Sequence, residues 1–513
     1  MKKFKKIREK ILLHPMMAFV FLTGFVILLS GLLDLFDASV TYNVINPKTG
    51  GYEASLVTVE SLLNLSGIKY IFSTTVSNFV SFAPLSMLLI TLIGIGIMDK
   101  SGFLDTLFFV LTKKVPKTAV TFIYVLICIL SSICGDLSFI VLIPLGALLF
   151  KYGKRNPEVG IIVSFASVAL GYGMSLTISS LDSSLINYTE LAARMISSGY
   201  TIPTAAYLII MLFAILIGAG LITYVTEKII VPKLGKYDVE EEIVQDKDKL
   251  TRRELRGLIF ALVGAVFYLA IFIYNIIPGL PFSGNLLDYS QGRYIDMLFG
   301  YESFFNSGFV FVVTFFFFLV GLLYGIGTKT ISNHRDICNF LSHSLDGIGK
   351  VIVLIFFSSM FVSLLKYTNI GTLFIAYLTN LVADSGFGGL LLVFLIFIVS
   401  IISTFIMPSF VNRWAVLSGT AVPLIMTAGY TPELAQLIFS AGSSIVYCLT
   451  PAMAYYVIYI SYMEKYDKDG IGLIKCTKIL IPYTIAILIL WVVLILVWTL
   501  VGLPLGLGTS GIL

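Results

Sequence analysis

The stretch SFASVALGYGMSLTISSLDSSLINY, Ser164–Tyr188, begins as an apolar helix and then becomes polar. Two glycines, Gly171 and Gly173, are followed by a run of serines and by one carboxylate, Asp182. In a lipid bilayer, backbone outside a helix is tolerated only within protein or against water. An ionisable side chain in such a segment marks a functional site by default. The stretch therefore predicts a discontinuous membrane helix, with Asp182 in a transport site.

The composition of the whole chain predicts an integral membrane protein. Of the 513 residues, 58% are hydrophobic and only 12% are charged, whereas about a quarter of an ordinary soluble domain is charged. The net charge of +5 does not indicate nucleic-acid binding, because the basic residues cluster in short loops, as the positive-inside rule requires. The five cysteines and three histidines have no spacing typical of a disulfide framework or a zinc site.

The N-terminal segment MKKFKKIREK resembles the basic start of a signal peptide. The apolar run from Pro15 is long enough to cross a bilayer, and no small-residue cleavage site ends it. We therefore expect an uncleaved first helix after a cytoplasmic basic N-terminus, residues 1–14. The setting that fits is a bacterial inner (plasma) membrane, crossed several times.

Residues 118–150 predict a re-entrant helical hairpin. Both ends of this segment are basic, and its middle contains Gly135 and Asp136. Two full crossings would need about 40 residues and a turn, and one crossing would leave a basic end outside. We expect the segment to enter from the cytoplasm, turn at a polar tip and return.

The second half of the chain repeats this order of features. In the first half, Pro157 starts a helix over 157–193 that we expect to break at 179–184. In the second half, residues 390–426 predict a hairpin with the tip MPSFVNRW, 407–414, between external ends. Pro432 then starts a helix over 432–463, with expected breaks at 442–444 and near 450–451.

These features together predict an all-α polytopic membrane protein. We expect about nine transmembrane helices and two re-entrant hairpins, arranged as an inverted repeat with discontinuous helices. The first half would cover residues 15–225 and the second 257–513, separated by a charged cytoplasmic loop over 226–256. Two further expectations are an external loop over 37–77 before a span at 78–98, and a segment lying flat outside the membrane over 367–382.

Six stretches resemble the p-aminobenzoyl-glutamate transporter (AbgT) family, and the resemblance covers the chain from Asn78 to its end. No single stretch is decisive, but their order and spacing are specific. They are NFVSFAPL (78–85), GDLSFIVLIPLGALLF (135–150), EKIIVPKLG (227–235), YGIGTKTI (324–331), TPELAQLIF (431–439) and VGLPLGLG (501–508).

The resemblance implies a homodimer of nine-span subunits with two hairpins each, in agreement with the count reached from the residues. It also implies a cation-coupled secondary transporter, an antiporter or symporter. Its substrate would be p-aminobenzoyl-glutamate or a related anionic aromatic antimetabolite, in uptake or drug efflux. No cofactor is implied beyond the coupling ion, H⁺ or Na⁺, so no metal is expected beyond a possible Na⁺.

Three functional positions of the family fall on this chain directly. They are the acid of the first broken helix at Asp182, the tryptophan of the second hairpin at Trp414 and the proline before the last broken helix at Pro432. The family usually has Phe-Arg-Ile-x-Asp-Ser in that last helix. This chain has FSAGS from Phe439, so Ser440 stands where the family has arginine, and the acid is also missing.

The two residues before the tryptophan also depart from the family pattern, which has small residues there. This chain has Asn412 and Arg413. Arg413 either extends its charge to the interface or supplies the positive charge of the missing arginine, which a substrate carboxylate needs. Trp414 either belongs to an interfacial aromatic belt or stacks on an aromatic substrate. The predicted substrate-binding residues are Asp182, Asn412, Arg413, Trp414, Pro432, Ser440 and Ser443.

Serines and a threonine at the two expected breaks, together with two acids, predict a cation site. Each acid has a plainer interpretation, because Asp182 could cap a helix or face water and Asp136 could cap the hairpin tip. The hydroxyl side chains could simply bond to their own helices. The predicted cation-binding residues are Asp136, Asp182, Ser183, Ser184, Ser444 and Thr450.

Other functional classes remain as alternatives. Transport of another small anion, such as a dicarboxylate, stays open because of Ser440 and Gly442. An ion channel would require both hairpins to line one continuous pore. An enzyme is not expected, because the three histidines, at 14, 334 and 343, have no catalytic partners in the sequence pattern.

Overall fold

The computed structural model describes residues 13–45, 51–113, 115–176, 179–203, 205–235, 237, 249–300, 303–466 and 472–513. Most of the predicted basic N-terminus, much of the charged loop 226–256, and Thr177 and Ile178 of the opening stretch lie outside these residues. The predictions for the masked parts of these segments therefore lie outside the residues that the structure describes.

The described part of the chain is mostly helical, as expected. The first half contains α2 (Pro15–Leu35), β1 (Ser39–Ile45), β2 (Tyr52–Thr58), α3 (Leu65–Val80), α4 (Ala83–Lys100), α5 (Phe103–Lys113), α6 (Lys117–Leu130), η1 (Ser131–Cys134), α7 (Leu137–Tyr152), α8 (Pro157–Gly171), α9 (Ser180–Arg194), α10 (Leu208–Val225), η2 (Thr226–Ile230) and α11 (Val231–Leu234).

The second half has the same helical character. It contains α12 (Arg252–Ile276), α13 (Tyr294–Phe299), α14 (Phe304–Thr328), α15 (His334–Ser344), α16 (Gly349–Tyr367), α17 (Ile370–Asp384), α18 (Gly389–Ile406), α19 (Phe410–Thr427), α20 (Pro432–Tyr447), α21 (Tyr456–Tyr466), α22 (Leu473–Val501), β3 (Pro504–Gly506) and β4 (Thr509–Ser510).

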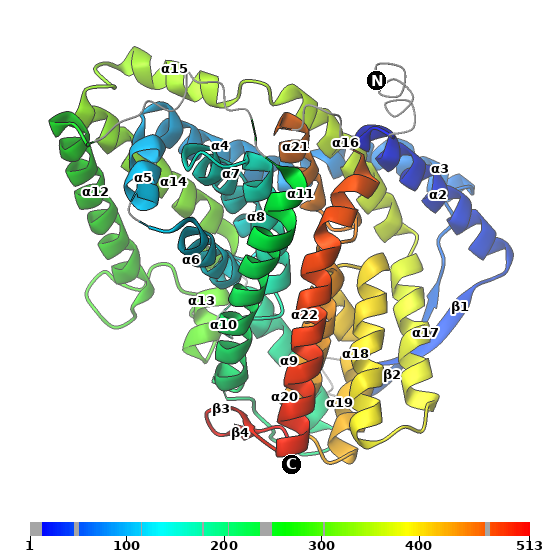
Figure 1. The fold of residues 1–513 in the computed structure, drawn as a ribbon. Helices are drawn as coiled ribbons and strands as arrows, with labels where there is room; N and C mark the ends of the chain where they lie inside the picture. Colours follow the sequence, from blue (N-terminus) through cyan, green and yellow to red (C-terminus); the bar gives the residue numbers. More distant parts are fainter. Residues whose placement is uncertain are drawn as a thin grey trace.

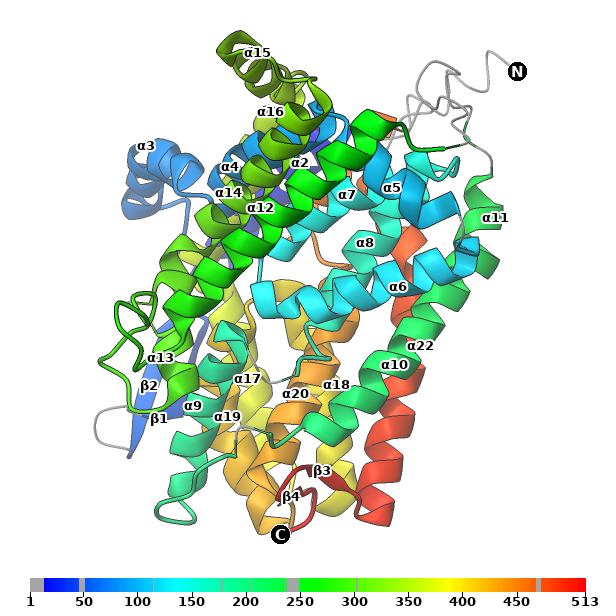
Figure 2. The same cartoon turned by 90° about the vertical axis from the view of Figure 1, so that its left-hand side faces the viewer.

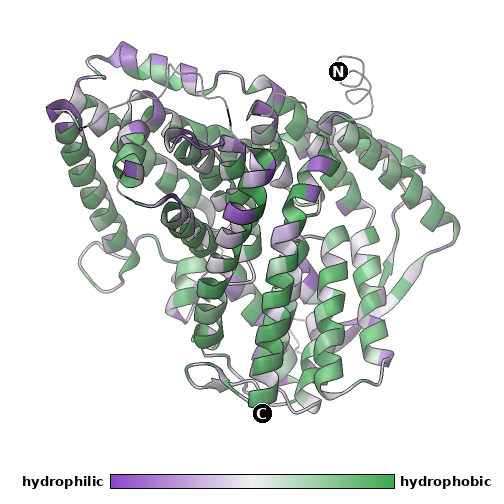
Figure 3. Ribbon diagram, in the orientation of Figure 1, coloured by the Kyte–Doolittle hydropathy of each residue, from purple (hydrophilic) through white to green (hydrophobic). Residues whose placement is uncertain are grey.

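Nine helices in the described residues are long and apolar enough to cross a membrane, which confirms the polytopic fold class. Figure 3 shows apolar residues along the flanking helices and hydrophilic residues gathered near the top, on α15 and the helix ends around it. The nine are not the nine expected crossings. They include α6 and α18, the first arms of the hairpins, and they leave out the two broken helices, whose separate arms are too short to span.

The two hairpins and the two broken helices are arranged in opposite directions. Figures 1 and 2 show α7 and α8 in the upper half of the molecule, with α18, α19 and α20 in the lower half. The second arms cross over: α9 lies low beside α19, and α21 lies high beside α7 and α8. This arrangement is the one expected for an inverted repeat. That the hairpins enter a membrane and return remains a prediction.

Both broken helices begin at the predicted proline. The first arm α8 ends at Gly171 and α9 begins at Ser180, whereas α20 ends at Tyr447 and α21 begins at Tyr456. The first break was expected at 179–184, which is wrong because residues from Ser180 onward are already helical. The break expected at 442–444 is also wrong. Gly442 lies inside α20, where an added Cβ would be 2.7 Å from the carbonyl oxygen of Phe397, so this glycine serves close packing on α18.

The expected external loop over 37–77 is wrong from residue 65 onward, where α3 begins. The serines and threonines of this segment suggested a loop, but they bond back to their own helix. Thr74 Oγ1, for example, donates to the carbonyl of Tyr70 at 2.7 Å, which satisfies a polar side chain without leaving the helix. The strands β1 and β2, paired antiparallel from Ser39 with Thr58, occupy the earlier part of the segment.

The segment expected to lie flat over 367–382 forms α17, which stands alongside α18 in Figure 1 and packs against α18 and α19. Its buried face includes Ile375, Ala376 and Val382. This apolar face explains the difference, because it is covered by α19 rather than by the membrane interface. Between α16 and α17 the chain turns at Asn369, whose φ is +56°.

The last residues of the chain bind the lower ends of other elements. Leu513 N donates to the carbonyl of Gly429 at 3.0 Å, and Thr431 N donates to that of Gly511 at 3.2 Å. Thr509 Oγ1 donates to the carbonyl of Ala206 at 2.6 Å. The C-terminal end therefore joins the α19–α20 turn to the start of α10.

A close contact between α7 and α8 gives a test of the fold. A Cβ on Gly160 would collide with the backbone carbonyl of Gly146, which cannot move independently of α7. We expect Gly160→Ala to lower the free energy of unfolding by about 1–3 kcal/mol, the usual cost of overpacking. Thermal unfolding of the purified protein in detergent measures this change.

The matched control is Gly220→Ala on α10, where an added Cβ meets nothing within 4 Å. Because alanine suits a helix interior better than glycine, we expect this variant to be unchanged or more stable by up to about 1 kcal/mol. A Gly160→Ala protein as stable as the Gly220→Ala protein would contradict the packing of α7 on α8.

Candidate functional site

A cavity of about 510 Å³ lies where the two halves meet, and we call it the central chamber. Its wall includes both hairpin tips and both helix breaks, the four features predicted to form the site. The lining residues from these features are Ile133, Cys134, Gly135, Asp136, Tyr172, Ser179, Ser180, Pro408, Ser409, Phe410, Tyr447, Ala452, Met453, Ala454 and Tyr455.

Four helices begin at this chamber, and their positions follow from the folding pattern. In a hairpin or a broken helix, the second arm must start where the first arm stops. The second arms α7, α9, α19 and α21 therefore have N-termini at or next to lining residues. Unpaired N–H groups and the positive end of the helix dipole favour an anion there. The first arms end in the same region and supply carbonyl oxygens, which suit a cation.

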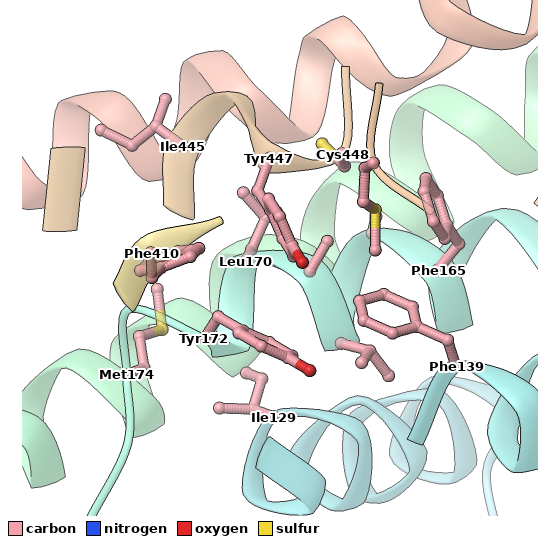
Figure 4. Close-up of a cluster of buried hydrophobic side chains, with 14 of the residues drawn as sticks. Ile129, Phe139, Phe165, Leu170, Tyr172, Met174, Phe410, Ile445, Tyr447 and Cys448 are labelled. Carbon is pink, nitrogen blue, oxygen red and sulfur yellow. The ribbon is translucent and has the colours of Figure 1, made fainter. Parts of the chain in front are cut away.

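Three aromatic residues that line the chamber, Tyr172, Phe410 and Tyr447, lie close together in Figure 4. The ring centroids of Tyr172 and Tyr447 are 5.3 Å apart, and that of Phe410 is 5.9 Å from Tyr172 and 5.2 Å from Tyr447. Each tyrosine lies at the end of a first arm, fifteen residues after its initiating proline, Pro157 or Pro432. The two tyrosines are thus equivalent positions of the repeat. Such rings offer flat apolar faces for an aromatic ligand.

Asp136 faces the chamber at the tip of the first hairpin. It occupies the N-cap position of α7 but makes no capping hydrogen bond with its side chain. Instead its Oδ1 accepts a hydrogen bond of 2.6 Å from the hydroxyl of Tyr172. The simple capping interpretation of Asp136 is therefore wrong, and the carboxylate is available at the chamber wall.

Asp182 lies behind the chamber, in the first turn of α9. Its carboxylate accepts hydrogen bonds from the hydroxyls of Ser175 and Ser179, and Ser179 also accepts from the backbone N–H of Asp182 at 3.1 Å. The carboxyl group lines a separate small cavity of about 10 Å³, together with Ser440 and Gln436. A cavity of this size holds roughly one water molecule. We call it the small cavity.

The other predicted cation ligands are not brought together at either cavity. Ser183 donates to Asp296 at 3.0 Å, Ser444 to the carbonyl of Ala441 at 2.9 Å and Thr450 to that of Phe405 at 2.8 Å. Only Ser184 lines the chamber, and it also bonds to a carbonyl of its own helix. For these side chains the structure shows helix or loop contacts. Ser444 nevertheless lies against Gly173, which lines the small cavity.

Arg413 is fully buried beside the chamber but does not line it. One of its terminal nitrogens donates to the carbonyl of Ser400 at 3.1 Å and to the hydroxyls of Ser403 and Ser443 at 3.3 and 2.8 Å. Its Nε and other terminal nitrogen have no hydrogen-bond partner among the described residues. The side chain therefore joins the second hairpin to α20, with donor capacity left over. This burial is inconsistent with an arginine that extends to the interface.

Trp414 is also fully buried. Its Nε1 donates to Thr189 Oγ1 at 2.9 Å, and its ring lies 4.6 Å from that of Phe439. Thr189 in turn donates to Gln436 Oε1 at 2.6 Å. The belt interpretation of Trp414 is therefore wrong. In this conformation Trp414 does not line the chamber. Its hydrogen bond joins α19 to Thr189 on α9, and Thr189 in turn joins α9 to Gln436 on α20.

The remaining predicted residues have separate locations. Pro432 is the first residue of α20 and does not line the chamber. Asn412 is exposed and lines a neighbouring cavity. Sequence reasoning missed Tyr172, Tyr447 and Gln436. The equal spacing of the two tyrosines from the prolines is a signal that could have revealed them.

Comparison with known proteins decides the family. The profile of the AbgT putative transporter family matches residues 4–513. This chain belongs to that family. The AbgT assignment agrees with the fold, the two breaks and the shared chamber described above, and it makes the protein a membrane transporter by family.

This chain is also similar to individual relatives and solved structures. The chain is 27% identical over 496 residues to the p-aminobenzoyl-glutamate transport protein of Escherichia coli (strain K12), which covers 96% of this chain and 94% of the relative. The fold of this chain is similar to that of Neisseria gonorrhoeae MtrF, with a TM-score of 0.51 and 30% sequence identity, and the match covers 99% of this chain and 100% of MtrF. The MtrF structure is described as illuminating a class of antimetabolite efflux pumps. The Alcanivorax borkumensis YdaH transporter gives a TM-score of 0.49 at 24% identity, with 96% and 100% of the chains covered.

The bond between Trp414 and Thr189 gives a test of this site. Thr189→Val keeps the side-chain shape but removes the hydroxyl that joins Trp414 to Gln436. Because two buried polar groups lose their partner, we expect the free energy of unfolding to fall by about 1–3 kcal/mol. Thermal unfolding in detergent measures this change.

Thr223→Val on α10 is the matched control, because the buried hydroxyl of Thr223 bonds only to the carbonyl of Ala219 in its own helix. We expect little change in that variant. Equal stability of the two variants would show that the network through Thr189 does not hold α9 against α20.

Proposed function

We propose that the protein is a cation-coupled secondary transporter that moves p-aminobenzoyl-glutamate or a related aromatic antimetabolite by alternating access. The observation that carries this proposal is the central chamber, which both hairpin tips and both breaks line. A substrate bound there contacts both halves of the inverted repeat at once. Rocking one half against the other would then open the chamber to either side.

The lining of the chamber supports an aromatic substrate with an anionic group. The volume of about 510 Å³ lies within the range typical for small-molecule sites. The rings of Tyr172, Phe410 and Tyr447 would hold the benzoyl ring, and Asp136 would accept a hydrogen bond from its p-amino group. The N-termini of α9 and α19 would stabilise a carboxylate.

The small cavity supports coupling to a cation at Asp182. Its size allows roughly one water molecule or small ion, and its carboxylate and hydroxyl oxygens suit H⁺ or Na⁺. One positive charge crossing the membrane potential releases about 2.3 kcal/mol per 100 mV. Tyr172 lines both cavities, so a change in the charge of Asp182 would reach the chamber through this ring.

The comparisons support the substrate class and leave two directions of transport. The Escherichia coli relative is named for transport of p-aminobenzoyl-glutamate, and MtrF is described with antimetabolite efflux pumps. We propose uptake or efflux by a homodimer in the bacterial inner membrane, with the N-terminus in the cytoplasm. A second candidate function is transport of another small anion, such as a dicarboxylate. Ser440, which lines the small cavity, stands at the position where the family usually has arginine.

The Asp182 carboxyl is the first test of coupling. Asp182→Asn keeps the shape and the capacity to bond with Ser175 and Ser179 but removes the charge. We expect this variant to be expressed normally and to lose cation-driven accumulation of p-aminobenzoyl-glutamate in proteoliposomes. Na⁺ and pH gradients, imposed separately, identify the coupling ion in the unmodified protein.

Asp384→Asn at the exposed end of α17 is the matched control and should accumulate substrate like the unmodified protein. Unchanged accumulation in Asp182→Asn would refute the role of Asp182 in coupling. Single-channel currents from the unmodified protein would instead indicate an ion channel.

Arg413 gives a second test, because its unpaired donors are close to the chamber but buried. If a movement of the second hairpin turns them toward the substrate, Arg413→Ala should weaken transport of p-aminobenzoyl-glutamate by at least about tenfold, as expected for a lost charged partner. A neutral sulfonamide should be affected much less. Equal losses for both substrates would mean that Arg413 only joins the second hairpin to α20.

A further inference from the structure

A second cavity of about 270 Å³ adjoins the central chamber, and we call it the side pocket. The two cavities share four lining residues, Val362, Pro408, Ser409 and Ala452. The tip of the second hairpin thus forms the wall between them. The other boundary of the side pocket is the break between α16 and α17.

The side pocket differs from the chamber in its chemistry. Asp136 faces the chamber, whereas no acidic residue belongs to the described lining of the side pocket. Of the described residues that line either cavity, only Lys366 is basic. The polar residues around the side pocket are Lys366, Asn369, Thr372, Ser409 and Asn412.

Lys366 lies in the last turn of α16, followed at once by the turn at Asn369 and the apolar helix α17. Its charge is favourable at a helix C-terminus, but by only about 0.3–1 kcal/mol. No ion pair with Lys366 is present in the part of the chain that the structure describes. The Lys366 side chain is exposed and lines the side pocket, so its charge is accessible to an anion bound there.

We propose that the side pocket binds the carboxylate tail of the substrate and that Lys366 neutralises it, while the aromatic ring occupies the chamber. This inference rests on the proposed function and specifies where a two-part substrate would lie. Ser409 lines both cavities and caps the N-terminus of α19. The positive end of that helix therefore lies beside both cavities, next to the expected positions of the ring and the tail.

Two other charged residues, Arg413 and Glu60, lie near the side pocket in the chain. Arg413 is fully buried and lines neither cavity, so it does not reach the tail in this conformation. Glu60 approaches the same break, since its backbone N–H donates to the carbonyl of Thr368 at 3.1 Å. The side chains of Glu60 and Lys366 are both exposed, Glu60 does not line the side pocket, and no ion pair joins the two among the described residues.

The experiment measures binding of two ligands to the purified full-length protein. p-Aminobenzoyl-glutamate carries the ring and the dicarboxylate tail, whereas p-aminobenzamide carries the ring without a charged tail. We expect Lys366→Gln to weaken p-aminobenzoyl-glutamate at least about tenfold, as for a lost charged hydrogen-bond partner. Binding of p-aminobenzamide should be unchanged, and Lys366→Arg should retain most of the affinity for the tailed ligand.

Control variants separate the tail site from a general effect. Lys350→Gln, at the other end of α16, should bind both ligands normally. Asn412→Ala changes an exposed side chain of the same pocket and should weaken only the tailed ligand, which keeps the test valid if Lys366→Gln does not fold. Glu60→Gln should not weaken the tailed ligand.

Several results would overturn the proposal. These are equal losses for both ligands in Lys366→Gln, a loss in Glu60→Gln that matches it, or no tighter binding of the tailed ligand than of p-aminobenzamide by the unmodified protein. Failure of the transport proposal has a different signature. In that case the Lys366-dependent difference in binding persists, but proteoliposomes accumulate no substrate under any cation gradient.

Discussion

A helix that stops inside an apolar environment leaves unpaired backbone groups at its end, and those groups require a polar partner. In this protein each half has two such stops, one at a hairpin tip and one at a break. Serines satisfy part of the requirement, since Ser179 and Ser409 accept from backbone N–H groups at the starts of α9 and α19. The remaining backbone groups face a polar partner in one chamber, because both hairpin tips and both helix breaks lie at its wall. The site is therefore a consequence of how the chain satisfies its own backbone.

Much of this arrangement could be predicted from the sequence because prolines and loop charges carry the information. Pro157 and Pro432 start the two broken helices at the expected residues. The positions of the breaks were harder to predict, because glycine and serine have two uses in membrane helices. At Gly442 the small residue allows α18 to approach closely, and the helix continues to Tyr447. A sequence pattern alone does not separate such packing from a break.

The candidate site was predicted less completely than the fold, and the reason is geometric. The sequence placed Asp182, Arg413 and Trp414 near the site, but it gave no information on which way each side chain points. Two of them are fully buried, and Asp182 faces a small cavity behind the chamber. The aromatic wall was missed because tyrosine and phenylalanine are common in a chain with 14% aromatic residues. Their role depends on contacts between distant segments.

The C-terminal residues add a mechanical constraint on any movement of the two halves. Gly511 and Leu513 bond to the turn that starts α20, and Thr509 bonds to the carbonyl of Ala206 just before α10. The lower ends of a second-half helix and a first-half helix are thus held together by the end of the chain. A movement that separates these lower ends must therefore break the hydrogen bonds of Thr509, Gly511 and Leu513.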